Sequence, residues 1–151
     1  MSPKTDWESD VSDLLRRAEF GAAVQRLKDV PLDKRRVTWH SLALFAWRAA
    51  ARSRGVPTSD TAQELLTLID AGLRRYPASS RLTYLRACVL LDNIDTEEAK
   101  RVLSEAKRMA LQNIQRDTTG ILTEAEEKLV EEINAIEEGV SRWRDSEWQR
   151  G

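Results

Sequence analysis

Residues 77–111, PASSRLTYLRACVLLDNIDTEEAKRVLSEAKRMAL, decide the fold. Small residues recur in this stretch with bulky partners three or four positions later, as in the pairs Ala87 and Leu90, and Ala99 and Leu103. Small side chains let two helices approach closely, and bulky ones fill the space between them. The stretch therefore predicts two packed antiparallel helices, over residues 80–92 and 96–116.

The same helical periodicity extends outward over the rest of the chain. Proline and glycine are scarce and fall between the candidate helices. Runs of alternating apolar and polar residues are absent, so no strand is expected. The predicted fold is all-α, with about seven helices over residues 6–17, 20–30, 36–54, 60–76, 80–92, 96–116 and 123–148. Short connections make neighbouring helices antiparallel hairpins.

Start and stop signals support these boundaries. A threonine precedes a glutamate by three residues at Thr5, Thr61 and Thr123. In such a capping box, the hydroxyl and the carboxylate satisfy free N–H groups of the first turn. The sixth helix has Asp95 or Thr96 as its cap. Glycines at the expected C-terminal stops are Gly55 and Gly120.

The composition is that of one domain with a modest core. The chain has 151 residues, 41% hydrophobic and 32% charged, and a net charge of −1 argues against a general nucleic-acid binder. No apolar run reaches the roughly 18 residues of a membrane span, and no apolar signal segment opens the chain, so we expect a cytoplasmic protein. One cysteine excludes an internal disulfide, and one cysteine with one histidine argues against a zinc site. No cofactor or metal is expected.

Three segments match in part a 34-residue helix–turn–helix repeat, W-x2-L-G-x2-Y followed by A-x3-F, a small residue and proline. The first half of the repeat pattern is matched best by Trp39, Leu42, Ala43 and Ala46. The second half is matched best by Ala99, Leu103 and Ala106. Over about residues 4–111 the chain therefore resembles the tetratricopeptide-repeat family. The repeats are degenerate, because Thr83 and Arg86 replace the aromatic residue and the leucine of the third unit. An unrelated all-α bundle is the alternative.

The resemblance implies three helical hairpins over residues 4–116, wound into a superhelix with a concave groove. In that family the first helix of each pair lines the groove, where a partner peptide or helix binds. Transferred to this chain, the groove positions are Glu8 and Ser12, then His40, Leu44, Trp47 and Arg48, then Arg81, Tyr84, Cys88 and Asp92. Trp, Tyr and Arg often dominate interface energetics. For Trp47 and Tyr84, a place in the core is the alternative.

Residues 123–148 form a separate amphipathic helix. Its apolar residues follow steps of four and three, which is coiled-coil spacing: Leu129, Ile133, Ile136, Val140 and Trp143. The opposite face is acidic. One interpretation is a capping helix that covers the core of the last repeat. The other is a docking or self-association seam, which would make the protein a homo-oligomer.

Charge is uneven along the chain. Residues 1–90 hold 15 Lys and Arg against 10 Asp and Glu, whereas residues 91–151 hold 9 against 15. Solvated helix faces account for this pattern. An arginine-rich surface that steers an acidic partner or RNA is the alternative. RNA is the weaker of these two, because no glycine-rich or aromatic-basic motif accompanies the arginines.

Catalytic motifs are absent from the sequence, which has no Gly-rich phosphate loop, H-E-x-x-H, C-x-x-C or G-x-S-x-G. A cysteine enzyme would need Cys88, His40 and Asp92 to meet, without an oxyanion loop nearby. We therefore predict a non-catalytic protein–protein interaction module: an adaptor, chaperone or scaffold. The alternatives are a self-assembling subunit that docks through its C-terminal helix, and an RNA-binding module.

Overall fold

The computed structural model describes residues 6–92, 95–121 and 123–150. The predicted all-α fold is confirmed, and these ranges contain no strand. The helices are α1 (Trp7–Arg16), α2 (Phe20–Lys28), α3 (Val37–Ser53), α4 (Ala62–Arg75), α5 (Ser80–Asp92), α6 (Thr96–Arg116) and α7 (Thr123–Arg150). Short 3-10 helices, η1 (Leu32–Lys34) and η2 (Thr58–Thr61), precede α3 and α4. Every predicted helix is present, with each end within two residues of its predicted position.

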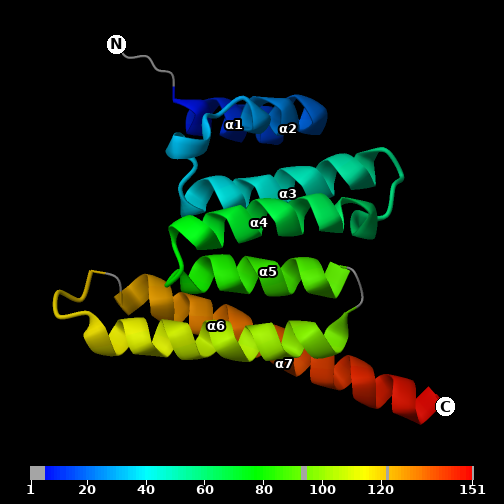
Figure 1. The fold of residues 1–151 in the computed structure, drawn as a ribbon. Helices are drawn as coiled ribbons and strands as arrows, with labels where there is room; N and C mark the ends of the chain where they lie inside the picture. Colours follow the sequence, from blue (N-terminus) through cyan, green and yellow to red (C-terminus); the bar gives the residue numbers. More distant parts are fainter. Residues whose placement is uncertain (1–5, 93–94, 122, 151) are drawn as a thin grey trace.

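The helices stack as antiparallel pairs (Figure 1). α3 packs against α1 and α5, and α5 also contacts α7, so the odd-numbered helices form a continuous row. Each even-numbered helix lies between two consecutive odd ones. Within the described ranges, α2 does not contact α4, and α4 does not contact α6. The two rows therefore differ: consecutive odd-numbered helices contact each other directly, whereas consecutive even-numbered helices are separated by an odd-numbered one.

Trp39 of α3 is the centre of the first core cluster. Its indole is fully buried, and its Nε1 donates to the carbonyl oxygen of Leu27 in α2 at 3.0 Å. The Arg35 guanidinium stacks on the same ring, 4.3 Å from its centroid. Buried alanines of α3, such as Ala43 and Ala46, let the neighbouring helices come close. This arrangement joins the first hairpin to the second.

A second core cluster joins the last three helices. Alanines and aliphatic residues of α5 and α6 pack there against Leu129 and Ile133 of α7. Figure 1 shows α7 running along α6 and ending beyond it at the C-terminus. The first part of α7 therefore covers apolar surface of α5 and α6 that would otherwise face water.

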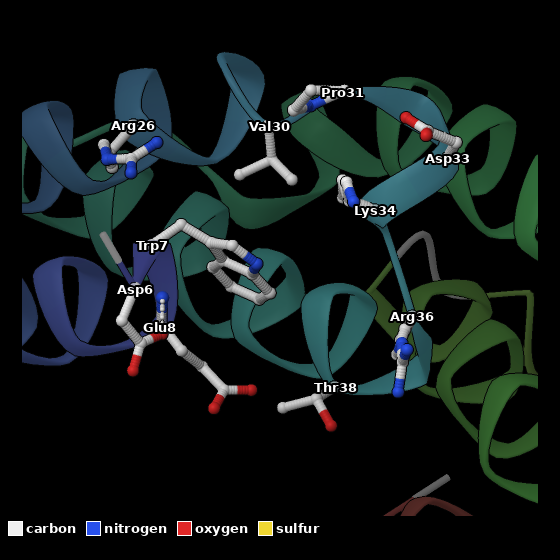
Figure 2. Close-up of a pocket in the computed structure, with 10 residues that line it drawn as sticks. All are labelled: Asp6, Trp7, Glu8, Arg26, Val30, Pro31, Asp33, Lys34, Arg36 and Thr38. Carbon is white, nitrogen blue, oxygen red and sulfur yellow. Dashed lines mark hydrogen bonds between the residues drawn. The ribbon is translucent and has the colours of Figure 1, made fainter. Parts of the chain in front are cut away.

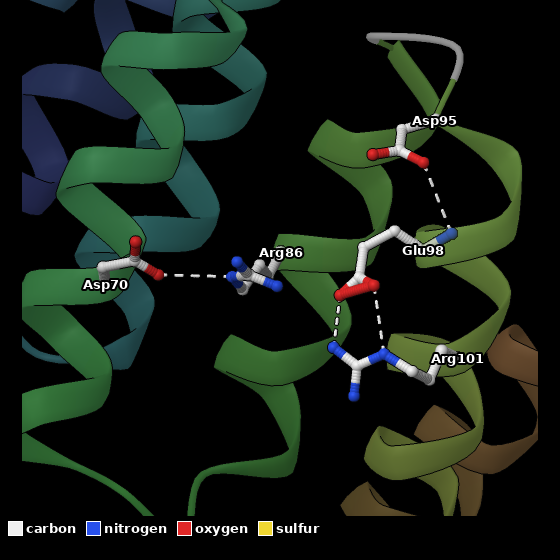
Figure 3. Close-up of polar contacts among 5 residues, drawn as sticks. All are labelled: Asp70, Arg86, Asp95, Glu98 and Arg101. Carbon is white, nitrogen blue, oxygen red and sulfur yellow. Dashed lines mark hydrogen bonds and ion pairs between the residues drawn. The ribbon is translucent and has the colours of Figure 1, made fainter.

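Only some of the predicted helix caps form. Asp95 caps α6 as predicted, accepting from the N–H of Glu98 at 3.4 Å (Figure 3). At α4, Thr61 occupies the N-cap position, but no side chain caps that end of the helix. The capping box predicted at Thr61 is wrong, and its glutamate, Glu64, accepts from Trp47 instead. The capping box at Thr123 stays a prediction, and its glutamate, Glu126, accepts from Ser80. Thr5 lies outside the described residues.

The turns use left-handed backbone at three positions. Gly55 follows α3 with φ +70°, as expected for a C-terminal stop. Gly120, with φ +77°, lies in the turn between α6 and α7 rather than directly at the end of α6. Ala18 adopts φ +59° after α1, where the N–H of Glu19 donates to the carbonyl oxygen of Leu14 at 2.9 Å. This hydrogen bond and the left-handed backbone of Ala18 end α1 and lead the chain into α2.

Candidate functional site

Phe45 stands out on the row of odd-numbered helices. Its side chain is 57% exposed, whereas its neighbours Leu44 and Ala46 are buried. At 100° per residue, the solvent-facing arc of α3 carries Ser41, Phe45, Arg48 and Arg52. Phe45 lies at one edge of this arc, about 40° from Ser41. We call the surface formed by these residues and by Arg81, Tyr84, Cys88 and Asp92 of α5 the odd-helix face.

Arg48 and Asp92 meet across this face. The Arg48 Nε donates to Asp92 Oδ2 at 2.6 Å, and its Nη2 donates to the backbone oxygen of Cys88 at 3.0 Å. Both side chains of the ion pair are mostly buried, at 22% and 17% exposed. Two residues that the sequence nominated for partner binding therefore bind each other and join α3 to α5.

Arg81 makes a similar connection between α5 and α7. Its Nη1 donates to Glu132 Oε2 at 3.0 Å, and its guanidinium lies 5.4 Å from the ring centroid of Tyr84. Tyr84 is half-buried beside Cys88, and burial raises the pKa of its phenol. Burial also raises the pKa of the Cys88 thiol. These groups are neutral near pH 7, so the charges of the face are those of its ion pairs and of the exposed Arg52.

Three nominated residues of α3 do not lie on the odd-helix face. Leu44 belongs to the core. Trp47 is also buried, and its Nε1 donates to Glu64 Oε1 of α4 at 2.5 Å. The His40 ring faces α4, because a Cβ on Gly72 would stand 2.6 Å from its Nε2. The resemblance to the tetratricopeptide repeat therefore assigned these three residues to the groove, whereas they lie on the buried side of α3.

Phe45 is the residue that the sequence reasoning missed. α3 is rich in apolar residues, so a phenylalanine among alanines and leucines looks like one more core position. The available signal was its spacing from the polar residues Ser41, Arg48 and Arg52, which mark the solvent side of the helix. On α1, the nominated Glu8 and Ser12 are exposed, and neither contacts the residues of α5 in an observed polar bond.

The apolar seam of α7 is used within the chain over its first half. Leu129 and Ile133 are buried, and Ile136 packs against both core clusters. Val140 and Trp143 lie outside the residues whose side chains are described. The described part of the seam therefore contacts α5 and α6 rather than facing solvent.

Many of the arginines connect helices. Arg86 of α5 donates to Asp70 of α4 at 3.2 Å (Figure 3). Arg35 and Arg75 donate to backbone carbonyl oxygens around η1. Arg52 and Arg54 form no ion pair with a described residue. A continuous arginine surface on the odd-helix face is therefore not present in the described part of the chain.

His40 and Cys88, two of the residues that a cysteine enzyme would need, lie in different surroundings. The His40 ring packs on α4, whereas Cys88 faces Tyr84 and Arg48. Among the described residues, no three His, Cys, Asp or Glu side chains are arranged to hold a metal ion. No described helix combines the length and apolarity needed to cross a membrane. No protein-family model matches the sequence, and comparison with curated proteins and with solved structures gives no match.

Proposed function

We propose that this protein is a non-catalytic interaction module, an adaptor, chaperone or scaffold, that holds a partner peptide or helix on its odd-helix face. The proposal includes a tetratricopeptide-like arrangement, in which three hairpins form a shallow superhelix closed by α7. It also includes a cytoplasmic location, in keeping with a chain whose single cysteine cannot form an internal disulfide.

The arrangement of the two rows supports this proposal. In a curved array of helix pairs, the helices on the inner side crowd together and those on the outer side spread apart. Here the odd-numbered helices contact one another, and the even-numbered helices do not within the described ranges. The odd-helix face would then be the concave side, where repeat proteins of this kind bind partners.

The exposure of Phe45 is the observation that carries the proposal. An aromatic side chain left 57% exposed retains apolar area that a partner can cover. The Arg48–Asp92 ion pair lies about one turn from Phe45 along α3, and the Arg81–Glu132 pair joins α5 to α7. An apolar centre with a polar rim is the usual anatomy of a protein interface. The partner that fits is a helix or peptide that presents an apolar side chain to Phe45.

The experiment compares Phe45→Glu with a matched variant on the other row, Leu111→Glu. Leu111 of α6 is 46% exposed, so both changes add a charge at an exposed apolar position. A photo-crosslinking amino acid at each position is first used to capture and identify a partner from extracts of the source cells. The affinity of the purified partner is then measured for the wild type and both glutamate variants.

We expect Phe45→Glu to weaken binding by at least about tenfold, as for a central interface residue, and Leu111→Glu to leave it unchanged. Equal affinities for the two variants would contradict the proposal. A captured partner identical to the protein itself would favour the self-assembling alternative. Arg48→Glu is a poorer probe, because the new carboxylate would face Asp92 and disturb the fold.

A further inference from the structure

A small pocket lies where η1 meets the start of α3 and the end of α4. Its volume is about 150 Å³, and its walls are mostly apolar. We call it the η1 pocket. The residues that line it include Leu32, Arg35, His40, Leu68, Ala71 and Arg75. A space of this size holds a chain or ring of about six carbon atoms.

Two arginines place positive charge at the η1 pocket. Arg35 donates to two backbone carbonyl oxygens, among them that of Val30 at 3.0 Å. Arg75 donates to the carbonyl oxygens of Leu32 and, at 3.3 Å, of Asp33. Among the described residues, no carboxylate forms an ion pair with either guanidinium. Because a guanidinium has five N–H groups, both arginines keep donors for a further acceptor, and their charges are not neutralised.

His40 shows that these charges act on the η1 pocket. Its side chain is 5% exposed, and its Nδ1 has no hydrogen-bond partner among the described groups. Burial and the positive charges of Arg35 and Arg75 lower the pKa of the ring. The field at the ring is therefore positive. An anion bound beside the ring would be stabilised by that field.

The larger cavity beside Trp7 has a different electrostatic character. It has a volume of about 540 Å³ and is lined by three acidic and three basic side chains, so opposite charges balance there (Figure 2). Asp33, which follows Leu32 in the chain, lines that cavity and not the η1 pocket. The described residues that line the η1 pocket include no carboxylate. The smaller pocket is therefore the one that favours an anion.

We propose that the η1 pocket binds an aliphatic monocarboxylate of about four to six carbon atoms. The carbon chain packs against Leu68 and against Leu32, which is 68% exposed and retains apolar area for a ligand to cover. The carboxylate pairs with Arg35 and Arg75. A free short-chain acid and the C-terminal leucine of a polypeptide present this same chemistry. The proposal uses no residue of the odd-helix face, so it is independent of the function proposed above.

The test follows the ring signals of His40, the only imidazole in the chain, by proton NMR at constant ionic strength. The free acid is represented by isocaproate, and its neutral isostere is isocaproamide. The polypeptide end is represented by acetyl-Gly-Leu, with its C-terminal amide as the matching neutral probe. Titration of each probe gives its affinity for the wild type.

Two pairs of variants test the residues of the η1 pocket. Ala71→Leu fills the pocket, and Ala22→Leu makes the same change at an exposed position of α2. Arg75→Gln removes one guanidinium, and Arg74→Gln removes an equal charge at the exposed neighbouring position. Thermal melting checks that each variant is folded. Because Arg75 also holds η1 in place, Ala71→Leu provides the test that keeps this contact.

We expect isocaproate to shift the His40 ring signals with millimolar affinity, and the amide to bind about fivefold or more weakly. Ala71→Leu and Arg75→Gln each weaken binding by about fivefold or more, and their controls by less than about twofold. Tighter binding of acetyl-Gly-Leu than of isocaproate would support the same chemistry and identify a chain end as its source. Unchanged ring signals, equal binding of acid and amide, or equal losses in the controls would overturn the proposal.

Discussion

Arg48 of α3 donates from Nε to Oδ2 of Asp92 in α5 at 2.6 Å, although the two residues are 44 positions apart in the chain. The same guanidinium also binds the carbonyl oxygen of Cys88. The contact joins two odd-numbered helices beside Phe45, so it contributes both to the stability of the fold and to the shape of the proposed binding face.

The first prediction concerns this ion pair. Arg48→Ala leaves the mostly buried carboxylate of Asp92 without its donor, so we expect the free energy of unfolding to fall by roughly 1–3 kcal/mol. Asp92→Ala leaves Arg48 with the carbonyl of Cys88 and costs less. Urea denaturation of both single variants and the double variant gives a coupling energy, expected to be about 1–2 kcal/mol. Additive effects would show that the two side chains do not interact in solution.

The second prediction concerns the seam of α7. Ile133 is fully buried against α6, so Ile133→Asp places a charge in apolar surroundings. We expect a loss of roughly 3–5 kcal/mol in unfolding free energy. The control is the neighbouring change Asn134→Asp, at an exposed position of the same helix. Light scattering is recorded on both variants, because a stable Ile133→Asp protein that has turned monomeric would identify the seam as an interface between copies.

The sequence predicts the helices well because helical periodicity and turn residues are local properties. The spacing of Ala87, Leu90, Ala99 and Leu103 is enough to define α5 and α6, whose ends are predicted without error. The capping box at Thr61 fails for a different reason. Glu64 has a tertiary partner, Trp47, which comes from a distant part of the chain and is invisible to a local pattern.

The rotation of each helix about its axis is harder to predict. On α5, the nominated Arg81, Tyr84 and Asp92 do share one face. On α3, the nominated His40, Leu44 and Trp47 point into the protein, and Phe45 points out. Apolar residues cover most of the circumference of α3, which packs against four other α-helices. Only the polar residues Ser41, Arg48 and Arg52 mark the arc that remains open. Whether Phe45 binds a partner stays a prediction.

The third prediction concerns the approach of α3 to α4. A Cβ at Gly72 would lie 2.6 Å from Nε2 and 2.8 Å from Cε1 of the buried His40 ring. The ring is enclosed, so Gly72→Ala forces the two helices apart, and we expect destabilisation by roughly 1–3 kcal/mol. Gly139→Ala in α7 is the matched control, because nothing lies within 4 Å of its added Cβ. The control gains up to about 1 kcal/mol from helix propensity, and thermal melting compares the two.

The expected loss of stability in Gly72→Ala would disappear if the His40 ring could move away. In that case Gly72→Ala would be neutral or stabilising, like Gly139→Ala, and the close packing of α3 on α4 would not constrain position 72. A variant that combines Gly72→Ala with His40→Ala separates the two explanations, because removal of the ring should restore most of the lost stability if the clash is its cause.

The last prediction is a pH dependence that comes from the single histidine. Burial, together with the positive charges of Arg35 and Arg75, lowers the pKa of His40 from 6.5 to about 4. The Nδ1 atom has no hydrogen-bond partner among the described groups, so nothing compensates a proton there. The unfolded chain therefore binds a proton more readily than the folded protein between these two pKa values.

The free energy of unfolding that depends on neutral His40 is consequently fully present above pH 6.5. It falls as the pH drops toward 4, by roughly 3 kcal/mol over the whole window. The measurement is the free energy of urea unfolding from about pH 7.5 to 4.5, for the wild type and for His40→Leu. Carboxylates titrate equally in both proteins, so the difference between the two curves isolates the imidazole, which is the only one in the chain. Parallel curves would mean that His40 takes up its proton in the folded state as easily as in the unfolded chain, and the dry packing of its ring against Gly72 would then be wrong.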